Sequence, residues 1–526
     1  RDLVRSRGLG DVYKRQGVGL METEVRFSIN KKNKKSVQKW LSQHKQIFQN
    51  SETVYFDTSK NALRDAGVEL RLRRNGKGIK QTIKSVGPNG SLFTRTESEI
   101  QLSDFEPKLS HLKKFLTREK LCRIDFARLR PAFRTKVNRT IINNPTKNGM
   151  VQSVFDVGEI KADAETQEIM EVEHELKQGS TDTLLETCHE FLDRVPCSIG
   201  LEGKAARGYR LVTGEYPEPV FASKISISPD LPLPKAMREI LQTSFQHAMT
   251  NLPVYLLTGH PESVHQFRVG LRRLRAALSA FAPILHLQNS GGLILQMKSI
   301  FNDFGSLRDA DVFLDETLAA LKNSTIPSSY YLILQEQVQQ FRDQRFQEAR
   351  DTLESTDFAR FIIDMNSWID SEEWLAQRRP IDQLMFERPI GVFAESRIQK
   401  MNQKLLKAGR RAEVGDLEDW HRLRIMTKKV RYASEPLLGI IGGKKGPSFA
   451  KSLSKLQDTL GKLNDLNSIE TFLAQVSLNV ERTDRQAFNE AAAFCVGWGA
   501  ASASTAGDNL QPSWRKFKMH MRKTWS

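Results

Sequence analysis

Charged residues on alternate positions of one short segment are the first feature of this sequence that could do chemistry. In METEVRFSIN (21–30), Glu22, Glu24 and Arg26 alternate with uncharged residues. Successive side chains of a β-strand point to opposite faces, so the segment predicts a strand with these three charges on one face. For a single strand, a solvated outer face is the simplest interpretation. The alternative is a polar lumen that holds a charged ligand and a metal.

The same pattern recurs in six further segments: 68–74, 79–84, 94–100, 132–137, 153–161 and 171–177. Several strands with charge of both signs on one face favour a closed antiparallel barrel with a charged interior, because closure also removes sheet edges. Arg and Lys bind phosphate oxygens, and paired carboxylates bind Mg²⁺ or Mn²⁺. The predicted interior therefore suits a metal-bound chain of phosphates.

The order of these motifs resembles the CYTH family of triphosphate tunnel metalloenzymes. The motifs are Glu22-x-Glu24-x-Arg26, Thr82-x-Lys84, Arg95-x-Glu97, Glu171-x-Glu173-x-Glu175 and GKAARGYRL (203–211). The resemblance spans about residues 21–212. It implies an eight-stranded antiparallel tunnel that hydrolyses or cyclises triphosphate compounds with a divalent metal.

The resemblance also implies roles for individual residues. The metal ligands would be Glu22, Glu24, Glu171, Glu173 and Glu175. The catalytic set would be Glu22, Glu24 and Arg26, with Glu97 and Asp156 positioning metal or water. The substrate would be held by Arg71, Arg73, Lys84, Arg95, Arg134, Lys136, Lys204 and Arg207. Two positions depart from the family pattern, because Arg26 replaces the usual Lys and Gly203 replaces the usual Ser.

Length and composition bound the remaining interpretations. A chain of 526 residues predicts more than one domain, and 79 Lys and Arg against 62 Asp and Glu give a net charge of +17. That excess indicates an anionic partner such as nucleic acid, polyphosphate or an acidic membrane surface. The four cysteines lack zinc-site spacing and predict free thiols. With no apolar run near the ~20 residues of a membrane span, a cytoplasmic protein is expected.

Periodicity divides the chain into segments with different predicted structure. Residues 1–20 have no sustained period and are interpreted as a non-native or misannotated leader. Residues 21–212 form the predicted tunnel domain, and the proline-rich segment 213–234 is the predicted linker. Residues 235–526 have a helical period. The expected fold class is therefore α+β, a β-tunnel followed by an all-α domain.

The helical half contains an internal duplication with an offset of 156 residues. Segment 265–275 recurs as segment 421–431, and Asp309 corresponds to Asp465. On a helix, His265, Arg268, Arg272 and Arg275 follow one stripe, and the second copy repeats it. No carboxylate occurs between Val264 and Asn302, so the stripe is expected to bind an anion. The two aspartates are expected to cap a helix or pair with Arg.

This half resembles the CHAD family of helical domains, which implies two helical bundles and binding of inorganic polyphosphate. The positions implied are His265, Arg268, Arg272, Arg273, Arg275, His421, Arg424, Lys428, Lys429 and Arg431. Nucleic acid could use the same stripe, but the stripe has no interleaved aromatic residues on which bases could stack. Polyphosphate has no bases and therefore fits better.

The order of a CYTH-like and a CHAD-like half resembles bacterial inorganic triphosphatases. The expected activity is metal-dependent hydrolysis of inorganic triphosphate to pyrophosphate and phosphate, with Mg²⁺ or Mn²⁺ as cofactor. Two alternatives remain. One is a tunnel enzyme for an organic triphosphate, either adenylate cyclase or thiamine triphosphatase. The other is a polyphosphate-binding scaffold with little turnover.

Overall fold

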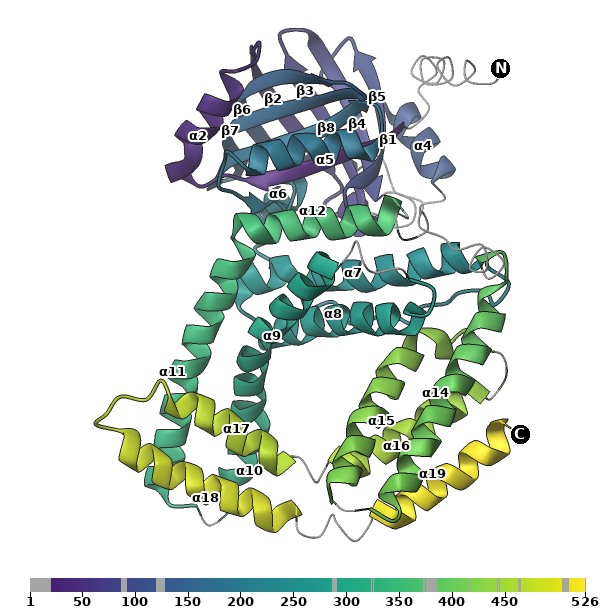
Figure 1. Ribbon diagram of the computed structural model, residues 1–526. Coiled ribbons are helices and arrows are strands. Elements are labelled where there is room, and N and C mark those ends of the chain that lie inside the picture. Colours follow the sequence, from purple (N-terminus) through teal and green to yellow (C-terminus); the bar gives the residue numbers. More distant parts are fainter. Residues whose placement is uncertain are drawn as a thin grey trace. The chain divides into compact units, whose positions relative to one another are not determined.

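The computed structural model describes residues 20–525 except 87–91, 120–127, 286–290, 323, 325, 372–373, 375–385, 416, 442, 444, 462–464 and 504–509. The predicted leader, apart from Leu20, and Cys122 lie outside the described residues. The chain divides into two compact units (Figure 1). The first comprises Arg1–Glu218 and Thr352–Ser367, and the second comprises Pro219–Asp351 and Trp368–Ser526.

The first unit is built on a closed antiparallel barrel, as predicted. Its strands follow the order β5-β4-β3-β2-β6-β7-β8-β1, and pairing of β1 with β5 closes the ring. A two-residue strand, β9, also pairs with β1. The strands are β1 (Leu20–Ser28), β2 (Ile47–Asp57), β3 (Val68–Asn75), β4 (Gly78–Val86), β5 (Thr94–Leu102), β6 (Arg130–Thr146), β7 (Gly149–Ala162), β8 (Glu165–Gln178) and β9 (Ser198–Ile199).

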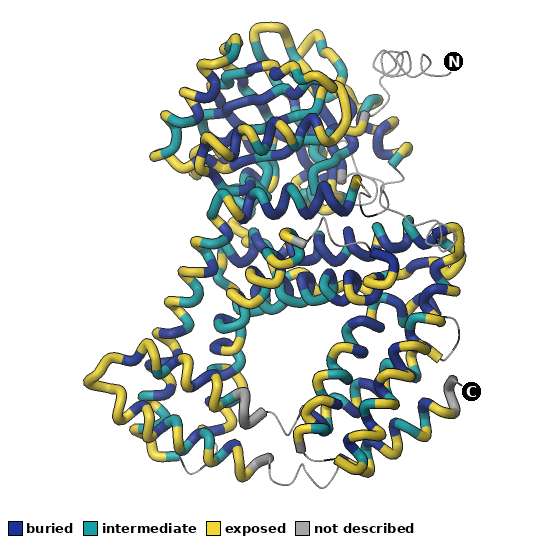
Figure 2. The backbone as a smooth tube through the Cα atoms, in the orientation of Figure 1, coloured by how far each residue is buried: buried dark blue, intermediate teal, exposed yellow. Residues whose placement is uncertain are grey.

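Much of the outer wall of the barrel is apolar and is buried by helices (Figure 2). On one side, Phe27 of β1 packs on Phe191 of α5 (Thr181–Leu192), which also contacts Trp40 of α2 (Lys34–Leu41). On another side, α3 (Ala62–Asp65) and α4 (Leu109–Arg118) cover a cluster from β2, β3 and β4 that includes Leu70, Leu72 and Ile83. Burying the apolar face outside leaves the charged face inside, which is the reverse of an ordinary soluble barrel.

Helix α6 (Lys204–Thr213) packs against one end of the barrel interior. Gly208 makes this approach possible, because a Cβ atom there would lie 2.1 Å from the ring of Phe133. The Tyr209 hydroxyl donates a hydrogen bond of 2.8 Å to the buried carboxylate of Asp57. The segment GKAARGYRL thus folds as a helix whose glycine and tyrosine fix its position on the barrel.

One helix of the first unit comes from far along the chain. In α12 (Thr356–Ser371), the part up to Ser367 groups with the barrel. The Thr356 hydroxyl accepts a hydrogen bond of 3.2 Å from the Cys197 amide. His189 of α5 lies between Arg360 at 2.7 Å and Asp364 at 2.8 Å. A division of the sequence at the proline-rich linker does not anticipate this grouping.

The second unit is helical among its described residues, and it shows the duplication in its helix order. Helices α7, α8, α9 and α11 recur at the predicted offset as α14, α15, α16 and α18. Their bounds, with those of the intervening elements, are α7 (Leu233–Thr258), α8 (Pro261–Phe281), α9 (Gly291–Val312), η5 (Phe313–Thr317), α10 (Leu318–Lys322), α11 (Ser328–Leu353), α14 (Ile390–Ala412), α15 (Leu417–Leu438), α16 (Lys445–Gly461), α17 (Asp465–Ser477), α18 (Arg485–Ala503) and α19 (Leu510–Trp525).

Two expectations about the whole chain can be compared with the described residues. Cys188, Cys197 and Cys495 are free and buried, as predicted for free thiols. Within the described part of the chain, no helix has the length and apolar character needed to cross a membrane.

Candidate functional site

A charged cavity of about 180 Å³ lies inside the barrel. Twenty-one described residues line it, and sixteen of them carry a charged side chain. All eight strands from β1 to β8 contribute to the lining. β2 contributes only Tyr55 and β6 only Arg139 among the described residues, whereas each of the other six strands contributes two or more. The predicted residues found in the lining are Glu22, Glu24, Arg26, Arg71, Arg73, Lys84, Arg95, Glu97, Glu173, Glu175 and Lys204.

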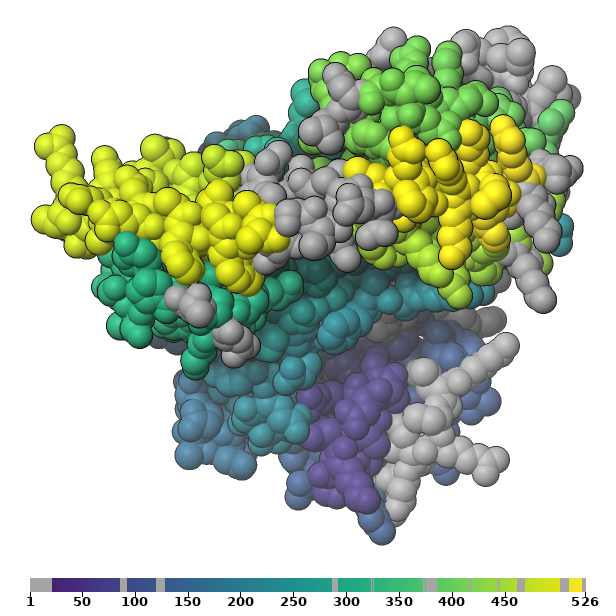
Figure 3. Space-filling model, turned by 90° about the horizontal axis from the view of Figure 1, so that it is seen from below, coloured from purple at the N-terminus to yellow at the C-terminus, as the bar shows by residue number. Residues whose placement is uncertain are grey.

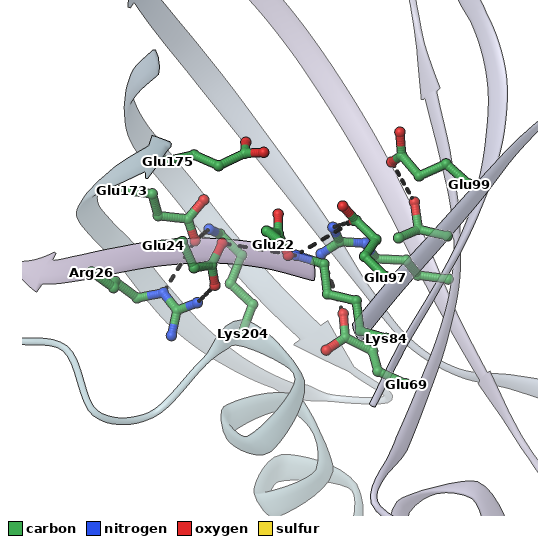
Figure 4. Close-up of polar contacts among 12 residues, drawn as sticks. Glu22, Glu24, Arg26, Glu69, Lys84, Glu97, Glu99, Glu173, Glu175 and Lys204 are labelled. Carbon is green, nitrogen blue, oxygen red and sulfur yellow. Dashed lines mark hydrogen bonds and ion pairs between the residues drawn. The ribbon is translucent and has the colours of Figure 1, made fainter. Parts of the chain in front are cut away.

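Lys84 of β4 forms one centre of charge in this cavity (Figure 4). Its ammonium group bonds Glu22 and lies 3.8 Å from Glu24 and 3.6 Å from Glu97. Burial opposes the charged form of Lys84, but these carboxylates outweigh it and raise the pKa of the ammonium. For Glu24, burial is likewise outweighed by Lys84 and Arg26, which lower its pKa to about 2.

Arg26 is held by carboxylates on both sides. Its guanidinium lies 2.8 Å from Glu24 and 3.1 Å from Glu173. A Cβ atom on Gly203 would lie 3.2 Å from Nη1 of Arg26. The two departures from the family pattern, Arg26 and Gly203, therefore lie side by side. The absent Cβ leaves room for the larger guanidinium.

Lys204 forms a second centre of charge at the end of the cavity nearest α6. Asp156, Glu171 and Glu173 each place a carboxylate oxygen within 4.8 Å of the others, an arrangement that could hold a cation. Lys204 already bonds all three, at 2.8 Å from Asp156 and 3.0 Å from Glu173. These carboxylates outweigh burial and raise the pKa of Lys204.

A different set of carboxylates comes from β1 and β8. Glu24 and Glu175 are direct partners in the β1–β8 register, and both line the cavity. Burial raises the pKa of Glu22 to about 7 against the effect of Lys84, and repulsion from Glu24 and Glu97 adds to the rise. Burial and Glu22 also raise the pKa of Glu175. Glu22, Glu24 and Glu175 are thus an oxygen-only donor set of the kind that Mg²⁺ or Mn²⁺ prefers. Lys84, Arg26 and Lys177 pair with these carboxylates, so a metal ion there would take the place of those cations.

Two predicted residues of β6 lie outside the cavity, and one residue of the same strand was missed. Arg134 and Lys136 are exposed on the outer face. The inward face of β6 instead carries Phe133, Val137 and Arg139. The strand was assigned the wrong phase because apolar residues were expected to face outward. Here the apolar residues face α6 inside the barrel.

Arg139 binds the predicted residue Asp156 through a bidentate pair, at 2.8 Å and 2.6 Å. Asp156 is fully buried, and Arg139 and Lys204 outweigh that burial to lower its pKa to about 2. Arg207 and Glu171 pair at 2.9 Å. Asp156, Glu171 and Arg207 do not line the cavity; they support the residues that do.

Other cations of the cavity come from β3, β4 and β5. Arg71 pairs with Glu69 at 3.2 Å, and Lys80 pairs with Glu99 at 3.0 Å. Burial, Arg71 and Arg139 lower the pKa of Arg73 to about 10. Glu69, Lys80, Glu99 and Lys177 line the cavity although no site role was assigned to them from the sequence. The alternation of β3, β4 and β5 places the first three on the charged face of their strands, as predicted.

In the second unit, the basic stripes of α8 and α15 meet at one aromatic ring. Arg272 of α8 lies over the ring of Tyr432 at 5.2 Å, and Arg431 of α15 lies over the same ring at 5.8 Å. Arg268 and Arg275 both lie over Phe301, at 4.3 Å and 4.8 Å. The rings are thus covered by guanidinium groups, which are stabilised by the ring faces.

Two of the ten predicted stripe residues, Arg273 and Lys429, do not lie on the stripe. Arg273 donates to the Ser223 carbonyl at 3.0 Å and lines a separate cavity of about 330 Å³ with Glu435. Lys429, its counterpart in the second copy, is exposed.

Arg308 was not predicted as part of the stripe. Burial is the first cause of the lowered pKa of His265, and the charge of Arg308 is the second. Asp309 acts electrostatically on Arg268, in line with the expected pairing with Arg.

The remaining stripe positions differ in exposure. His421 is exposed, whereas Arg424, Lys428 and Arg431 are half-buried. Asp465 begins α17, and the side chains at this end of the helix are not described. Eight of the ten predicted positions therefore lie on one face of α8 or of α15, because they recur at helical spacing on these two helices.

Two family models match this chain. The CYTH domain model matches residues 20–209, and the CHAD domain model matches residues 239–474. An inorganic triphosphatase from Haemophilus influenzae is 26% identical over 212 residues, which are 38% of this chain and 58% of that protein. This chain thus spans less than two thirds of the relative's length.

Solved structures are similar to each unit. The CHAD domain from the plant Ricinus communis is 25% identical, with a TM-score of 0.48, and covers 57% of this chain and 96% of that chain. A Hippeastrum protein with a dominant triphosphatase activity is 16% identical, with a TM-score of 0.27, and covers 36% of this chain and 94% of that chain.

Proposed function

We propose that this protein, which combines a CYTH domain with a CHAD domain, hydrolyses inorganic triphosphate inside its barrel with the help of a divalent metal. The observation that carries the proposal is the cavity lining, in which nine basic and seven acidic residues face one another. The basic residues would bind the phosphate oxygens, and the carboxylates would hold the metal. The name of the Haemophilus relative supports the same activity.

Inorganic triphosphate is favoured over a nucleotide or thiamine triphosphate by what the lining lacks. Pockets for organic groups are lined mainly by apolar and aromatic side chains. Only five of the described lining residues are uncharged: Tyr55, Gln152, Val154, Gly203 and Ala205. A base or a thiamine ring would therefore find few contacts among the described residues.

Glu22, Glu24 and Glu175 would hold the metal, which supplies positive charge to the phosphate oxygens and lowers the pKa of a bound water. Lys84 keeps Glu22 and Glu24 oriented, while Arg71, Arg73 and Arg95 face the same cavity and would grip the phosphates. Arg139 is bonded to both oxygens of Asp156 and would position that carboxylate. Arg26 and Lys204 are engaged by carboxylates, so we assign them mainly to positioning. Catalysis by positioning and electrostatic stabilisation needs no covalent nucleophile.

The helical unit would bind inorganic polyphosphate along the stripes on α8 and α15. Arg272 and Arg431 meet over Tyr432, so a chain of phosphates could contact both helices at once. The ring faces near the stripe are occupied by guanidinium groups, which leaves them less available for stacking with bases.

The test is phosphate release from inorganic triphosphate, ATP, thiamine triphosphate and long-chain polyphosphate, each with Mg²⁺, with Mn²⁺ and with EDTA. We expect metal-dependent turnover of triphosphate well above the other substrates. The double variant Glu22→Gln/Glu24→Gln should lose turnover by about a hundredfold or more, with polyphosphate binding retained. Glu159→Gln/Glu165→Gln removes two carboxylates outside the cavity lining as a matched control.

Two results would contradict the proposal. Preferred turnover of ATP or thiamine triphosphate would indicate a tunnel enzyme for an organic substrate. No turnover of any substrate, together with tight polyphosphate binding, would indicate a binding scaffold.

A further inference from the structure

A groove of about 580 Å³ runs between α16 and the C-terminal helix α19. Its floor contains Leu456 and Phe517, and Asp458 is the single carboxylate among its described lining residues. The other lining residues are basic or carry hydroxyl groups: Lys451, Lys455, Lys516, His520, Ser448, Ser452, Thr459 and Ser513. Figure 3 shows α19 in yellow on the face seen from below, against green helices of the same bundle.

The spacing of these residues gives the groove two matching walls. Lys451 and Lys455 are four residues apart on α16, and Lys516 and His520 are four apart on α19, so each pair shares one helix face. The Thr459 and Ser513 hydroxyls lie 3.3 Å apart, which joins the walls at one end. From Ser448 to Thr459 the α16 wall is roughly 16 Å long at the rise of an α-helix.

The lysines of the groove are not neutralised by acidic side chains. Among the described residues, Lys451, Lys455 and Lys516 have no ion pair with a carboxylate. By contrast, Lys518, two residues after Lys516, bonds both oxygens of Glu413 at 3.0 Å and 2.8 Å. Three lysines that face one groove repel one another unless an anion joins them.

The groove is not a repeat of the duplicated stripe. At the offset of 156 residues, Lys451 and Lys455 correspond to Leu295 and Ser299 of α9, which carry no charge. Helix α19 corresponds to α12, whose part up to Ser367 groups with the barrel. Residues 510–525 also lie beyond the match to the CHAD model, which ends at 474. The basic groove therefore belongs to the second copy.

We propose that this groove is a second anion-binding site, which takes an extended chain of phosphate groups independently of the stripes on α8 and α15. Lysine supplies point charges for phosphate oxygens. Three of the four hydroxyls already bond within the groove, Ser448 with His520 and Thr459 with Ser513, so the lysines are its main anion-binding groups. Phe517 is buried in the floor and offers no exposed ring for a base, so inorganic polyphosphate fits better than a single-stranded nucleic acid. The choice of ligand rests on the proposed function, whereas the site rests on the groove.

The test is binding of fluorescently labelled inorganic polyphosphate to the full chain, measured by fluorescence anisotropy. The variant Lys451→Gln/Lys455→Gln/Lys516→Gln should bind about tenfold more weakly, since each exposed lysine contributes a modest contact. The control variant Lys400→Gln/Lys404→Gln/Lys407→Gln removes the same charge from exposed positions of α14 that do not line the groove. The control should bind within about twofold of the wild type.

Two further arms separate this site from the rest of the molecule. In the background Arg272→Gln/Lys428→Gln, the groove variant should reduce the remaining affinity by a similar factor, as independent sites do. Triphosphate hydrolysis should not change in the groove variant, so failure of this site is distinguishable from failure of the proposed hydrolysis.

Three outcomes would overturn the inference. The first is equal weakening by the groove and α14 variants, which would indicate a general effect of net charge. The second is no loss in the background that lacks the stripe. The third is a larger loss for a labelled single-stranded DNA of equal charge than for polyphosphate, which would assign the groove to nucleic acid.

Discussion

The barrel interior and the stripes on α8 and α15 both concentrate cations, but they stabilise them by different contacts. In the barrel, Lys84 and Lys204 each face three carboxylates. On the helices, Arg272 and Arg275 lie over aromatic rings instead. A neutralised, enclosed site can discriminate by geometry and by its metal, because a ligand must replace existing interactions. An open row of cations binds any suitably spaced anion, and salt competes with it.

The largest effect should come from removing a cation of the barrel. Lys204→Met removes the ammonium group that bonds Asp156, Glu171 and Glu173 together. Arg139, Arg207 and Arg26 still pair with one carboxylate each, so the loss should be at most about 3–5 kcal/mol, the cost of a buried charge left unpaired. We expect the opening free energy of β7 and β8, measured by amide hydrogen exchange, to fall by up to that amount, and hydrolysis to be lost. Lys177→Met removes a more exposed lysine and should cost less than about 1 kcal/mol. Equal losses would show that burial in the barrel does not distinguish the two lysines.

Removing cations from the stripes should affect stability less than removing one from the barrel, but it should clearly weaken binding. Arg272→Gln/Lys428→Gln should weaken polyphosphate binding about tenfold and make its dependence on salt less steep. The unfolding free energy should change by about 1 kcal/mol or less, since Arg272 loses a contact with a ring face and both side chains are only half-buried. Lys400→Gln/Lys404→Gln is the charge-matched control. Loss of the fold in the stripe variant would contradict the contrast with the barrel.

A finer test concerns the contact between Arg26 and residue 203. Gly203→Ser brings a Cβ atom to 3.2 Å from Nη1 of Arg26 and should lower kcat/KM for triphosphate modestly. Arg26→Lys should relieve that crowding, so the double variant should recover activity relative to the sum of the single variants, by about 0.5–1 kcal/mol. Strict additivity in this double-mutant cycle would mean that the two departures from the family pattern are unrelated.

The smallest effect should arise outside both sites, on the wall of the barrel. His111 of α4 contacts Gln81 and Ser98 at 3.0 Å and 2.8 Å, and burial, with Lys108 and Lys114, lowers its pKa. The unfolded chain therefore takes up this proton first, so His111 stabilises the fold above pH 6.5 and less as the pH falls. His111→Gln should remove less than about 1 kcal/mol of that dependence, read from hydrogen exchange of β4 and β5 between pH 7.5 and 5.5.

The sequence predicted the interior of β1, β3, β4 and β5 correctly because their alternation is unbroken. It failed at β6, where Phe133 and Val137 face α6 inside the barrel and the apolar face is therefore not the outer one. Arg139 shares this inward face, so the same error left it out of the predicted site. Alternation shows which residues share a face, but only a packing partner decides which face is inside.

The helical unit has the same limitation. The period of 3.6 residues placed His265, Arg268, Arg272 and Arg275 on one stripe, and the duplication identified its counterpart. It could not predict that Arg273 turns to Ser223 or that Arg308 lies close enough to affect His265. Both contacts join segments far apart in the chain, and no local pattern in the sequence specifies them.

The position of α12 has a consequence for the synthesis of this protein on the ribosome. The first unit includes residues 352–367, which follow the end of α6 by more than a hundred residues. Domains generally fold as units while translation adds roughly 5–20 residues each second. The residues of the barrel are therefore synthesised on the order of ten seconds before those of α12, which contacts α5 in the folded protein. During that interval, Cys197 and His189 lack the contacts that α12 later supplies.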